Sequence, residues 1–278
     1  MTPSRSQGKR IIAITSGKGG VGKTSLAVAI GSLLARSGRR VILVDLDLGL
    51  ANVDVLLGFR PKFHLQHLLA GARTLDEVAF TAPGGLRVIP SSSGVEELAN
   101  LDETGRARLL NLFQEFERQT DILLLDTAPG IAENVVRFVA AADTAVVITT
   151  PEATAMTDAY ALIKVVSARR QDLDIGLLVN MARSGSSGRQ AQERIGGVAR
   201  RFLGAAPRAL GVLPFDESVS YAAAERASFV HSRPNSPASL CLGRAVAELM
   251  EGSPGQAASG PAACAARLAA LAPVQEVA

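Results

Sequence analysis

The chain has 278 residues, of which 47% are hydrophobic and only 4% are aromatic, and its formal net charge is +3. A core of this size must be built from Leu, Val, Ile and Ala, which is typical of a buried parallel sheet covered by helices and argues against a β-sandwich. The small net charge does not by itself indicate a nucleic-acid partner. The two cysteines, Cys241 and Cys264, form no CxxC pair, so neither a cluster site nor a disulfide framework is expected.

The two ends of the chain differ in composition from its middle. The N-terminal residues 1–9 are polar and basic, and the apolar run that follows is too short for a signal peptide. No run approaches the ~18 residues of a membrane-spanning helix. We therefore expect a cytoplasmic protein with a flexible N-terminus (1–9), one domain over 10–250 and an Ala/Gly-rich tail over 251–278. The end of this tail, Pro261–Ala278, could be either a frayed helix or disordered.

Short apolar runs of strand length recur along the chain, and they are rich in Val, Ile and Leu, as in strands buried on both faces. They are Ile11–Thr15, Val41–Asp45, Leu86–Ile89, Ile122–Asp126, Ala145–Thr150, Ile175–Asn180 and Ala209–Leu213. Helical patterns lie between them: an apolar stripe over 26–34 that ends before Gly38, and further patterns at roughly 102–119, 132–142, 154–169, 188–203 and 238–250. This alternation predicts a doubly wound α/β fold, with a mostly parallel sheet and helices on both faces.

A glycine-rich loop between the first strand and the first helix carries the strongest motif. Residues 17–24 fit G-x-x-x-x-G-K-[ST] in the strand–loop–helix context that this motif requires. The glycines allow backbone N–H groups to turn around phosphates at the helix N-terminus. Lys23 is expected to reach the β- and γ-phosphates, and the Thr24 hydroxyl to ligate Mg²⁺. The predicted contacts with ATP in this segment are Gly17, Gly19, Gly20, Val21, Gly22, Lys23, Thr24 and Ser25.

Acidic residues follow two of the predicted strands: Asp45 and Asp47 after the second strand, and Asp126 at the end of Leu123–Asp126. Ligands of open α/β sheets bind at the carboxyl ends of the strands, so these carboxylates should converge on the phosphates. A carboxylate there can hold Mg²⁺ through water, orient an attacking water or simply cap the following turn. Gly49 and Gly130 would let the two loops shift when the γ-phosphate leaves.

The run from Lys18 to Thr24 (KGGVGKT) resembles the signature of the deviant Walker-A ATPases, which include MinD, ParA, the Mrp-type carriers and the nitrogenase iron protein. In that family the first lysine crosses a dimer interface to the partner's nucleotide, so the resemblance implies that Lys18 couples ATP binding to formation of a homodimer. It also implies that Asp47 positions or activates the water and that Asp126, in D-T-A-P-G, is the Walker-B magnesium residue. The implied catalytic residues are Lys18, Lys23 and Asp47, and the implied metal site is Thr24, Asp47 and Asp126, with ATP or ADP and Mg²⁺ as ligands.

Two further strand ends resemble the adenine-binding segments of this family. They are Leu178–Asn180 and Gly211–Asp216. A side-chain amide can both donate and accept, so Asn180 could read the edge of adenine, with Pro214 and Asp216 beside the base. An asparagine at a strand end is also an ordinary turn former. No N-K-x-D guanine motif is visible, which favours adenine.

Within the family, Asp45–Gly49 (DLDLG) differs from the D-x-D-P-Q of ParA proteins, and Gly49–Asp54 with Pro151–Lys164 is more similar to the FlhG group (FleN, YlxH) of regulators of flagellar number and placement. The resemblance implies a flagellar partner: an FlhF-type GTPase, a basal-body component or a flagellar transcription regulator. It places the dimer and partner surface at Lys18, Asn52, Glu152 and Asp158. The two acids could equally be an ordinary acidic first turn of a helix. A MinD-like division-site ATPase and a ParA-like DNA partition ATPase remain alternatives.

Three features bear on partners. The N-terminal segment lacks the D-Q-A-x-x-L-R found in many FlhG proteins, which puts direct stimulation of the GTPase in doubt. The segment Ala262–Leu271 has a single basic residue and too little apolar bulk for a strong interfacial anchor, so association with a membrane or cell pole is at most transient. Six arginines between residues 175 and 215, against one acid, favour a solvated or protein-docking helix face over DNA: Arg183, Arg189, Arg194, Arg200, Arg201 and Arg208.

Overall fold

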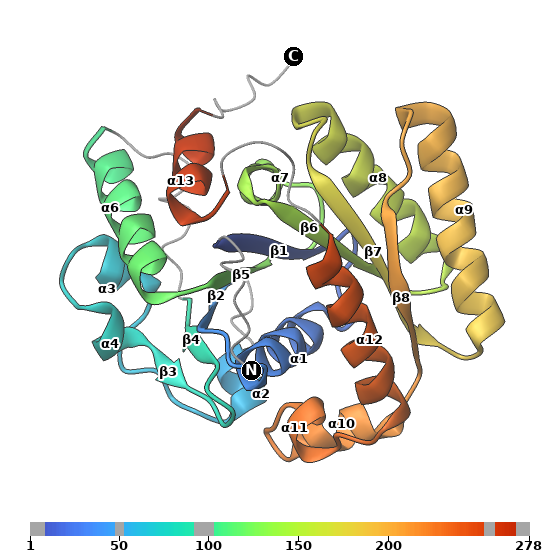
Figure 1. The fold of residues 1–278 in the computed structure, drawn as a ribbon, viewed down its shortest axis with the longest axis horizontal. Helices are drawn as coiled ribbons and strands as arrows, with labels where there is room; N and C mark the ends of the chain where they lie inside the picture. Colours follow the sequence, from blue (N-terminus) through green and yellow to red (C-terminus); the bar gives the residue numbers. More distant parts are fainter. Residues whose placement is uncertain (1–8, 48–52, 92–102, 253–258, 271–278) are drawn as a thin grey trace, which may run out of the picture.

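An 8-stranded sheet with the order β3-β4-β2-β5-β1-β6-β7-β8 forms the centre of the computed structural model (Figure 1), which describes residues 9–47, 53–91, 103–252 and 259–270. Every pairing is parallel except that of β3 with β4. The strands are β1 (Arg10–Ser16), β2 (Val41–Leu46), β3 (Phe80–Thr81), β4 (Arg87–Ile89), β5 (Ile122–Thr127), β6 (Thr144–Thr149), β7 (Asp174–Ala182) and β8 (Arg208–Pro214). The predicted mostly parallel sheet is confirmed, and the predicted runs coincide with all strands except the short edge strand β3.

Helices lie between most successive strands, and α10 to α13 follow the last strand, β8. They are α1 (Lys23–Arg36), α2 (Val53–Leu57), α3 (Leu65–Leu69), α4 (Leu75–Val78), α6 (Glu103–Gln119), α7 (Glu133–Ala141), α8 (Ala153–Arg169), α9 (Gly185–Leu203), α10 (Glu217–Ala224), α11 (Phe229–Ser232), α12 (Pro237–Glu251) and α13 (Pro261–Ala270). The long helices match the predicted patterns. The sequence patterns do not predict α10, which has 8 residues, or α2, α3, α4 and α11, which have only 4 or 5 residues each, too few for a helical period to be visible. Among the described residues, none of the helices has both the length and the apolar character needed to cross a membrane.

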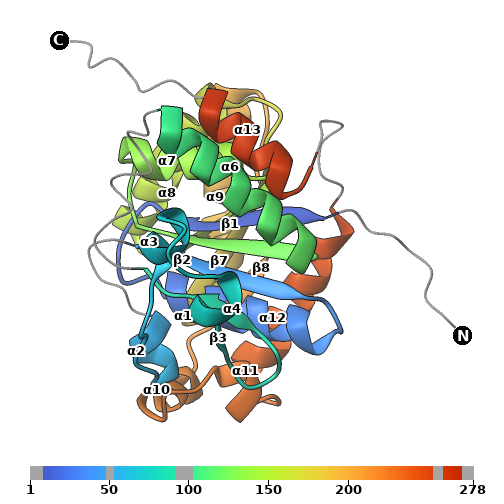
Figure 2. The ribbon, with the colours of Figure 1, turned by 90° about the vertical axis from the view of Figure 1, so that its left-hand side faces the viewer.

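The sheet is buried on both faces because side chains of a strand alternate between them. In β1, Ile11 and Ala13 pack into one apolar cluster, while Ile12 and Ile14 pack into the other. Figure 2 shows α6, α7, α8, α9 and α13 on one side of the sheet and α1, α10, α11 and α12 on the other. Helix α1 ends at Arg36, and Gly38 follows in the left-handed conformation (φ 86°), as its predicted role in stopping the helix requires.

The C-terminal segment contributes a packed helix to this domain. Cys264, Ala265 and Leu268 of α13 are buried in the cluster formed with α6 and α7, which extends the folded body beyond residue 250. The Asp143 carboxylate, 2% exposed, connects this helix to the sheet, because it pairs with Arg267 at 2.7 Å and accepts hydrogen bonds from the N–H groups of Ile11 and Gly260. Of the two possibilities left open for this segment, helix is observed for its described part.

Removal of the Asp143 carboxylate should destabilise the domain strongly. Asp143→Ala removes the charged partner of the partly buried Arg267 guanidinium and the acceptor of two backbone N–H groups, so we expect the free energy of unfolding to fall by about 3 kcal/mol. Asp172→Ala is the matched control: it removes an ion pair with Arg170 whose carboxylate is 61% exposed, and should cost less than about 1 kcal/mol. Urea denaturation of both variants measures the difference, and equal losses would contradict the assigned role of Asp143.

Candidate nucleotide-binding site

The glycine-rich loop occupies the turn from β1 to α1, at the carboxyl end of the central strand. Gly20 (φ 80°) and Gly22 (φ 86°) have left-handed backbone conformations, which residues other than glycine rarely adopt. A Cβ atom at Gly17 would lie 2.2 Å from the carbonyl carbon and oxygen of Asp158, so the loop packs directly on the backbone of α8. The loop therefore requires glycine both for its turns and for this contact.

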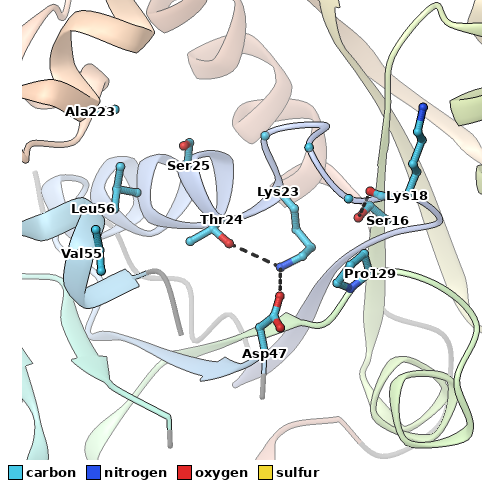
Figure 3. Close-up of a pocket in the computed structure, with 13 residues that line it drawn as sticks. Ser16, Lys18, Lys23, Thr24, Ser25, Asp47, Val55, Leu56, Pro129 and Ala223 are labelled. Carbon is cyan, nitrogen blue, oxygen red and sulfur yellow. Dashed lines mark hydrogen bonds and ion pairs between the residues drawn. The ribbon is translucent and has the colours of Figure 1, made fainter. Parts of the chain in front are cut away.

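A hollow of about 440 Å³ opens beside the loop (Figure 3). It is lined by Ser16, Lys18, Gly19, Gly20, Gly22, Lys23, Thr24, Ser25, Asp47, Val55, Leu56, Pro129 and Ala223. Most of the predicted phosphate-contacting residues therefore share one concave surface at the N-terminus of α1, where the helix dipole favours an anion. Val55 and Leu56 of α2 and Ala223 of α10 add an apolar end to the hollow that no motif in the sequence indicates.

The two carboxylates predicted to act with Lys23 lie next to it. Its Nζ is 2.7 Å from Oδ1 of Asp126 and 3.9 Å from Oδ2 of Asp47. Lys23 and Asp126 are 7% and 0% exposed. Burial raises the pKa of Asp126, whereas the charge of Lys23 and its hydrogen bond act in the opposite direction. Lys23 thus neutralises a carboxylate that the sheet has taken out of water.

Asp45, which the sequence left open between a structural and a functional role, is a third carboxylate in this cluster. It lies directly opposite Asp126 in the parallel pairing of β2 with β5 and is 1% exposed. It accepts a hydrogen bond from the backbone N–H of Asp47 at 2.9 Å, which orients the residue predicted to position water. Burial, followed by the charge of Asp126, raises the pKa of Asp45 to about 7.

The oxygen atoms around Lys23 fit a Mg²⁺ ion. Oδ2 of Asp126, a residue that does not itself line the hollow, is buried and has no hydrogen-bond partner among the described residues, and the hydroxyl of Thr24 lies 3.4 Å from the Lys23 ammonium. Carboxylate and hydroxyl oxygens are the donors that Mg²⁺ prefers, usually together with water and phosphate. Thr24, Asp47 and Asp126 are therefore suited to hold a hydrated Mg²⁺ beside bound phosphates.

The other lysine of the loop has different neighbours. Figure 3 shows Lys18 extending away from Lys23 and Asp47. Its Nζ lies 3.4 Å from Oε2 of Glu152 and 3.0 Å from Oγ1 of Thr154, and its side chain is 41% exposed. The sequence placed Lys18 and Glu152 on one surface, and the structure brings them into contact; Thr154 was not predicted as a site residue.

The predicted adenine segments lie at the edge of the loop. Asn180 donates from Nδ2 to the backbone carbonyl of Val21 at 2.9 Å, so it contacts the loop itself. Pro214 ends β8 and is half-buried. Both carboxylate oxygens of Asp216 accept backbone N–H groups, from Ser218 in α10 and Ala238 in α12, at 3.0 Å each. Asp216 thus caps two helices, a role that its place in the motif did not reveal.

The remaining predicted surface residues are placed only in part. Asp158 is half-buried in the second turn of α8, where its backbone contacts Gly17. Asn52 and Gly49, which follow β2 in the chain, lie outside the described residues. Gly130, after β5, has a left-handed conformation (φ 98°) and donates its N–H to the carbonyl of Ser16, which links this part of the chain to the start of the phosphate loop.

The fold and this loop place the chain among the P-loop nucleotide-binding proteins. A family described as an AAA domain matches residues 9–178. The antiactivator FleN of Pseudomonas aeruginosa is 41% identical over 245 residues, 88% of this chain and 87% of that protein. The flagellum site-determining protein YlxH of Helicobacter pylori is 37% identical over 197 residues, 70% of this chain and 65% of that protein. Among solved structures, the MinC:MinD cell division protein complex of Aquifex aeolicus matches with a TM-score of 0.72 and 25% identity, over 90% of this chain and 100% of that one.

The chain belongs to the MinD/ParA family of P-loop ATPases. The resemblance read from KGGVGKT is thereby confirmed, together with its FleN- and YlxH-like character and the α/β fold.

The raised pKa of Asp45 predicts a pH dependence of stability. An unfolded aspartate titrates near 3.8, whereas folded Asp45 keeps its proton up to about 7. The contribution of the protonated Asp45 carboxyl to the free energy of unfolding is therefore fully present below pH ~3.8 and is lost as the pH rises through about 7. Between these limits we expect the free energy of unfolding of Asp45→Asn to fall less steeply with pH than that of the wild type, by up to about 1.4 kcal/mol per pH unit. Urea denaturation with EDTA and without nucleotide tests this, and parallel pH profiles would contradict it.

Proposed function

We propose that this protein is an ATP-binding and ATP-hydrolysing switch that forms a homodimer in the ATP state and acts on a flagellar partner. The observation that carries the proposal is the divergence of the two loop lysines. Lys23 is buried against Asp126, while Lys18 extends away from Lys23 and Asp47 to the exposed start of α8. One lysine therefore serves the nucleotide of its own chain, and the other is available to a second chain.

The contacts of Lys18 are weak enough to be exchanged. Glu152 is 70% exposed, and ion pairs at such positions contribute little to stability because water screens them. A phosphate offers a stronger, charge-assisted contact than this pair. In the ATP-bound homodimer, Lys18 leaves Glu152 and Thr154 and binds the nucleotide of the facing protomer, so that nucleotide state controls association.

Hydrolysis in this proposal depends on the carboxylates around Lys23. The lysine exchanges Asp126 for the β- and γ-phosphates, and Asp126 with Thr24 holds Mg²⁺, which supplies positive charge to neutralise the phosphate oxygens. Asp47 is 15% exposed at the wall of the hollow and orients the attacking water. Since phosphoryl transfer needs placement of charge more than covalent help, a loss of Asp47 slows turnover more than binding.

The flagellar assignment follows from the similarity to FleN, described as an antiactivator, and to YlxH, described as flagellum site-determining. The proposed partner is an FlhF-type GTPase, a basal-body component or a flagellar transcription regulator, met in the cytoplasm. Membrane association is not part of the proposal, because the apolar residues Cys264 and Leu268 of α13 are buried against the domain. The alternatives are a division-site role, as in the MinD relatives, and DNA partition.

Helix α9 offers a surface for such a partner at the outer edge of the domain (Figure 1). Phe202 is 66% exposed and Val198 40% exposed, and the Arg201 guanidinium lies 5.3 Å from the centre of the Phe202 ring. Within the described part of the chain, no ion pair involves the arginines of this surface: Arg183, Arg189, Arg194, Arg200 and Arg201. Arginine beside exposed apolar side chains suits an acidic protein surface better than a nucleic-acid backbone. A phosphate backbone binds the arginines but offers no apolar surface to pack against the other side chains.

Lys18→Ala should abolish ATP-dependent dimerisation while retaining ATP binding. Loss of a charge-assisted contact across an interface costs about 2–5 kcal/mol, so the dimer should weaken by at least about 30-fold. Light scattering after size exclusion, with ATP, Mg²⁺ and the slowly hydrolysing Asp47→Ala background, measures the mass. Lys164→Ala, which removes an exposed lysine on α8, is the control and should still dimerise. A dimer that forms without ATP, or that survives Lys18→Ala, would refute the mechanism.

Asp47→Ala should lower the rate of ATP hydrolysis by about 100-fold, with ATP affinity changed by no more than a few-fold. The variant then serves as bait in a pull-down from lysate of the source cell, once with ATP and once with ADP. Recovery of a flagellar protein in one nucleotide state alone is expected. Division proteins, or DNA with a centromere-binding protein, would overturn the flagellar role and leave the ATPase intact.

A further inference from the structure

Met181 has a backbone conformation that its residue type does not favour. Its φ is 55°, in the left-handed region, and Arg226 is the only other non-glycine residue of the described chain with a positive φ. The residue lies where the pairing of β7 with β8 is irregular, between Val179 and Ala182. Left-handed conformations of bulky residues cost free energy and are found mainly at ligand sites, so this one calls for a functional explanation.

Fixed contacts on both sides hold Met181 in this conformation. Before it, the Asn180 amide donates to the carbonyl of Val21 in the phosphate loop at 2.9 Å. After it, the carbonyl of Ala182 accepts the N–H of Phe215 at 2.9 Å. The turn therefore carries the Met181 side chain at the junction of the phosphate loop and the ends of β7 and β8.

The side chain reaches the phosphate loop. A Cβ atom at Gly22 would lie 3.4 Å from the methyl carbon of Met181, and Gly22 lines the hollow immediately before α1. Met181 is nevertheless 37% exposed, although Leu177, Leu178, Val179 and Ala182 of the same strand are buried. The conformation thus turns an apolar, polarisable side chain out of the core and places it beside Gly22, a residue that lines the hollow.

We propose that Met181 forms the apolar platform for the base of the bound nucleotide. The inference rests on the proposed ATP site and adds to it a residue that positions and selects the base. Thioether groups make favourable contacts with aromatic rings, and the flexible methionine side chain adapts to a flat surface. The Asn180 amide and the Met181 methyl both lie against Gly22, which lines the hollow, so a base bound at Asn180 would lie beside the methionine side chain.

The substitution Met181→Gly separates a role in binding the base from a purely structural role of Met181. Met181→Gly removes both the side chain and the cost of the left-handed conformation, so the thermal midpoint should stay the same or rise. The affinities for ATP and ADP should fall by about three- to tenfold. Inorganic tripolyphosphate, which has the phosphates but no base, should bind both forms equally.

The experiment is calorimetric titration of Met181→Gly, Met181→Leu and the wild type with Mg²⁺-ATP, ADP and tripolyphosphate. Met181→Leu keeps the apolar bulk and should bind ATP within about twofold of the wild type. Val198→Ala, at a similarly exposed apolar residue (40%) in the second half of α9, is the matched control and should change none of the affinities.

Two results would overturn the inference on Met181 alone: unchanged ATP affinity in Met181→Gly, or an equal loss for ATP and tripolyphosphate. The second would mean that the substitution distorts the phosphate loop. A wild-type protein that binds tripolyphosphate but neither ATP nor ADP would overturn the proposed function as well. The failures of the two proposals are therefore distinguishable.

Discussion

The buried contact between Lys23 and Asp126 is the interaction on which the site depends. The parallel register of β2, β5 and β1 brings the carboxyl ends of these strands together, and it places Asp45 directly opposite Asp126. Two carboxylates at 1% and 0% exposure would repel each other and lack hydration, and the Lys23 ammonium 2.7 Å from Asp126 offsets part of that cost. The same group that stabilises this cluster is the one that the motif assigns to phosphate. A ligand that drew Lys23 away from Asp126 would redistribute charge in the core of the sheet, next to the loops that follow β2 and β5.

Helix α8 is the element that connects the phosphate loop to the surface. Its backbone at Asp158 contacts Gly17 so closely that no side chain fits at that glycine, and its first residues hold Lys18 through Glu152 and Thr154. A displacement of the loop must be transmitted to α8, because packed backbones cannot interpenetrate. On the far side, α8 packs against α7 and α9. Helix α7 begins at Glu133, shortly after Gly130, and α9 carries exposed arginines. The phosphate loop and the arginines of α9 are thus connected through a continuous set of packed elements.

The C-terminal helix shows that tertiary contacts can make a segment helical even when its sequence pattern does not settle whether it is folded. Alanine-rich with two leucines and one arginine, Ala262–Leu271 has little bulk by which to predict its partner. The structure supplies that partner in the groove of α6 and α7, and the Asp143 carboxylate fixes the connection through Arg267 and Gly260. Asp143 lies more than a hundred residues before Gly260 in the chain, so the helix propensity of the C-terminal segment cannot predict this contact.

The alternation of strands and helices, the phosphate loop and the positions of Lys23, Asp47 and Asp126 can be predicted from the sequence. These follow from local rules: apolar periodicity, the conformations that glycine permits, and the rule that strand ends of a parallel sheet share one edge. The folded structure was needed to find the direction of Lys18, the pairing of Asp45 with Asp126, the double capping by Asp216 and the left-handed turn at Met181. Each of these depends on the distance between residues far apart in the chain or on one backbone angle set by flanking contacts. No sequence pattern of period 2 or 3.6 encodes such distances, because they are fixed by packing across the sheet.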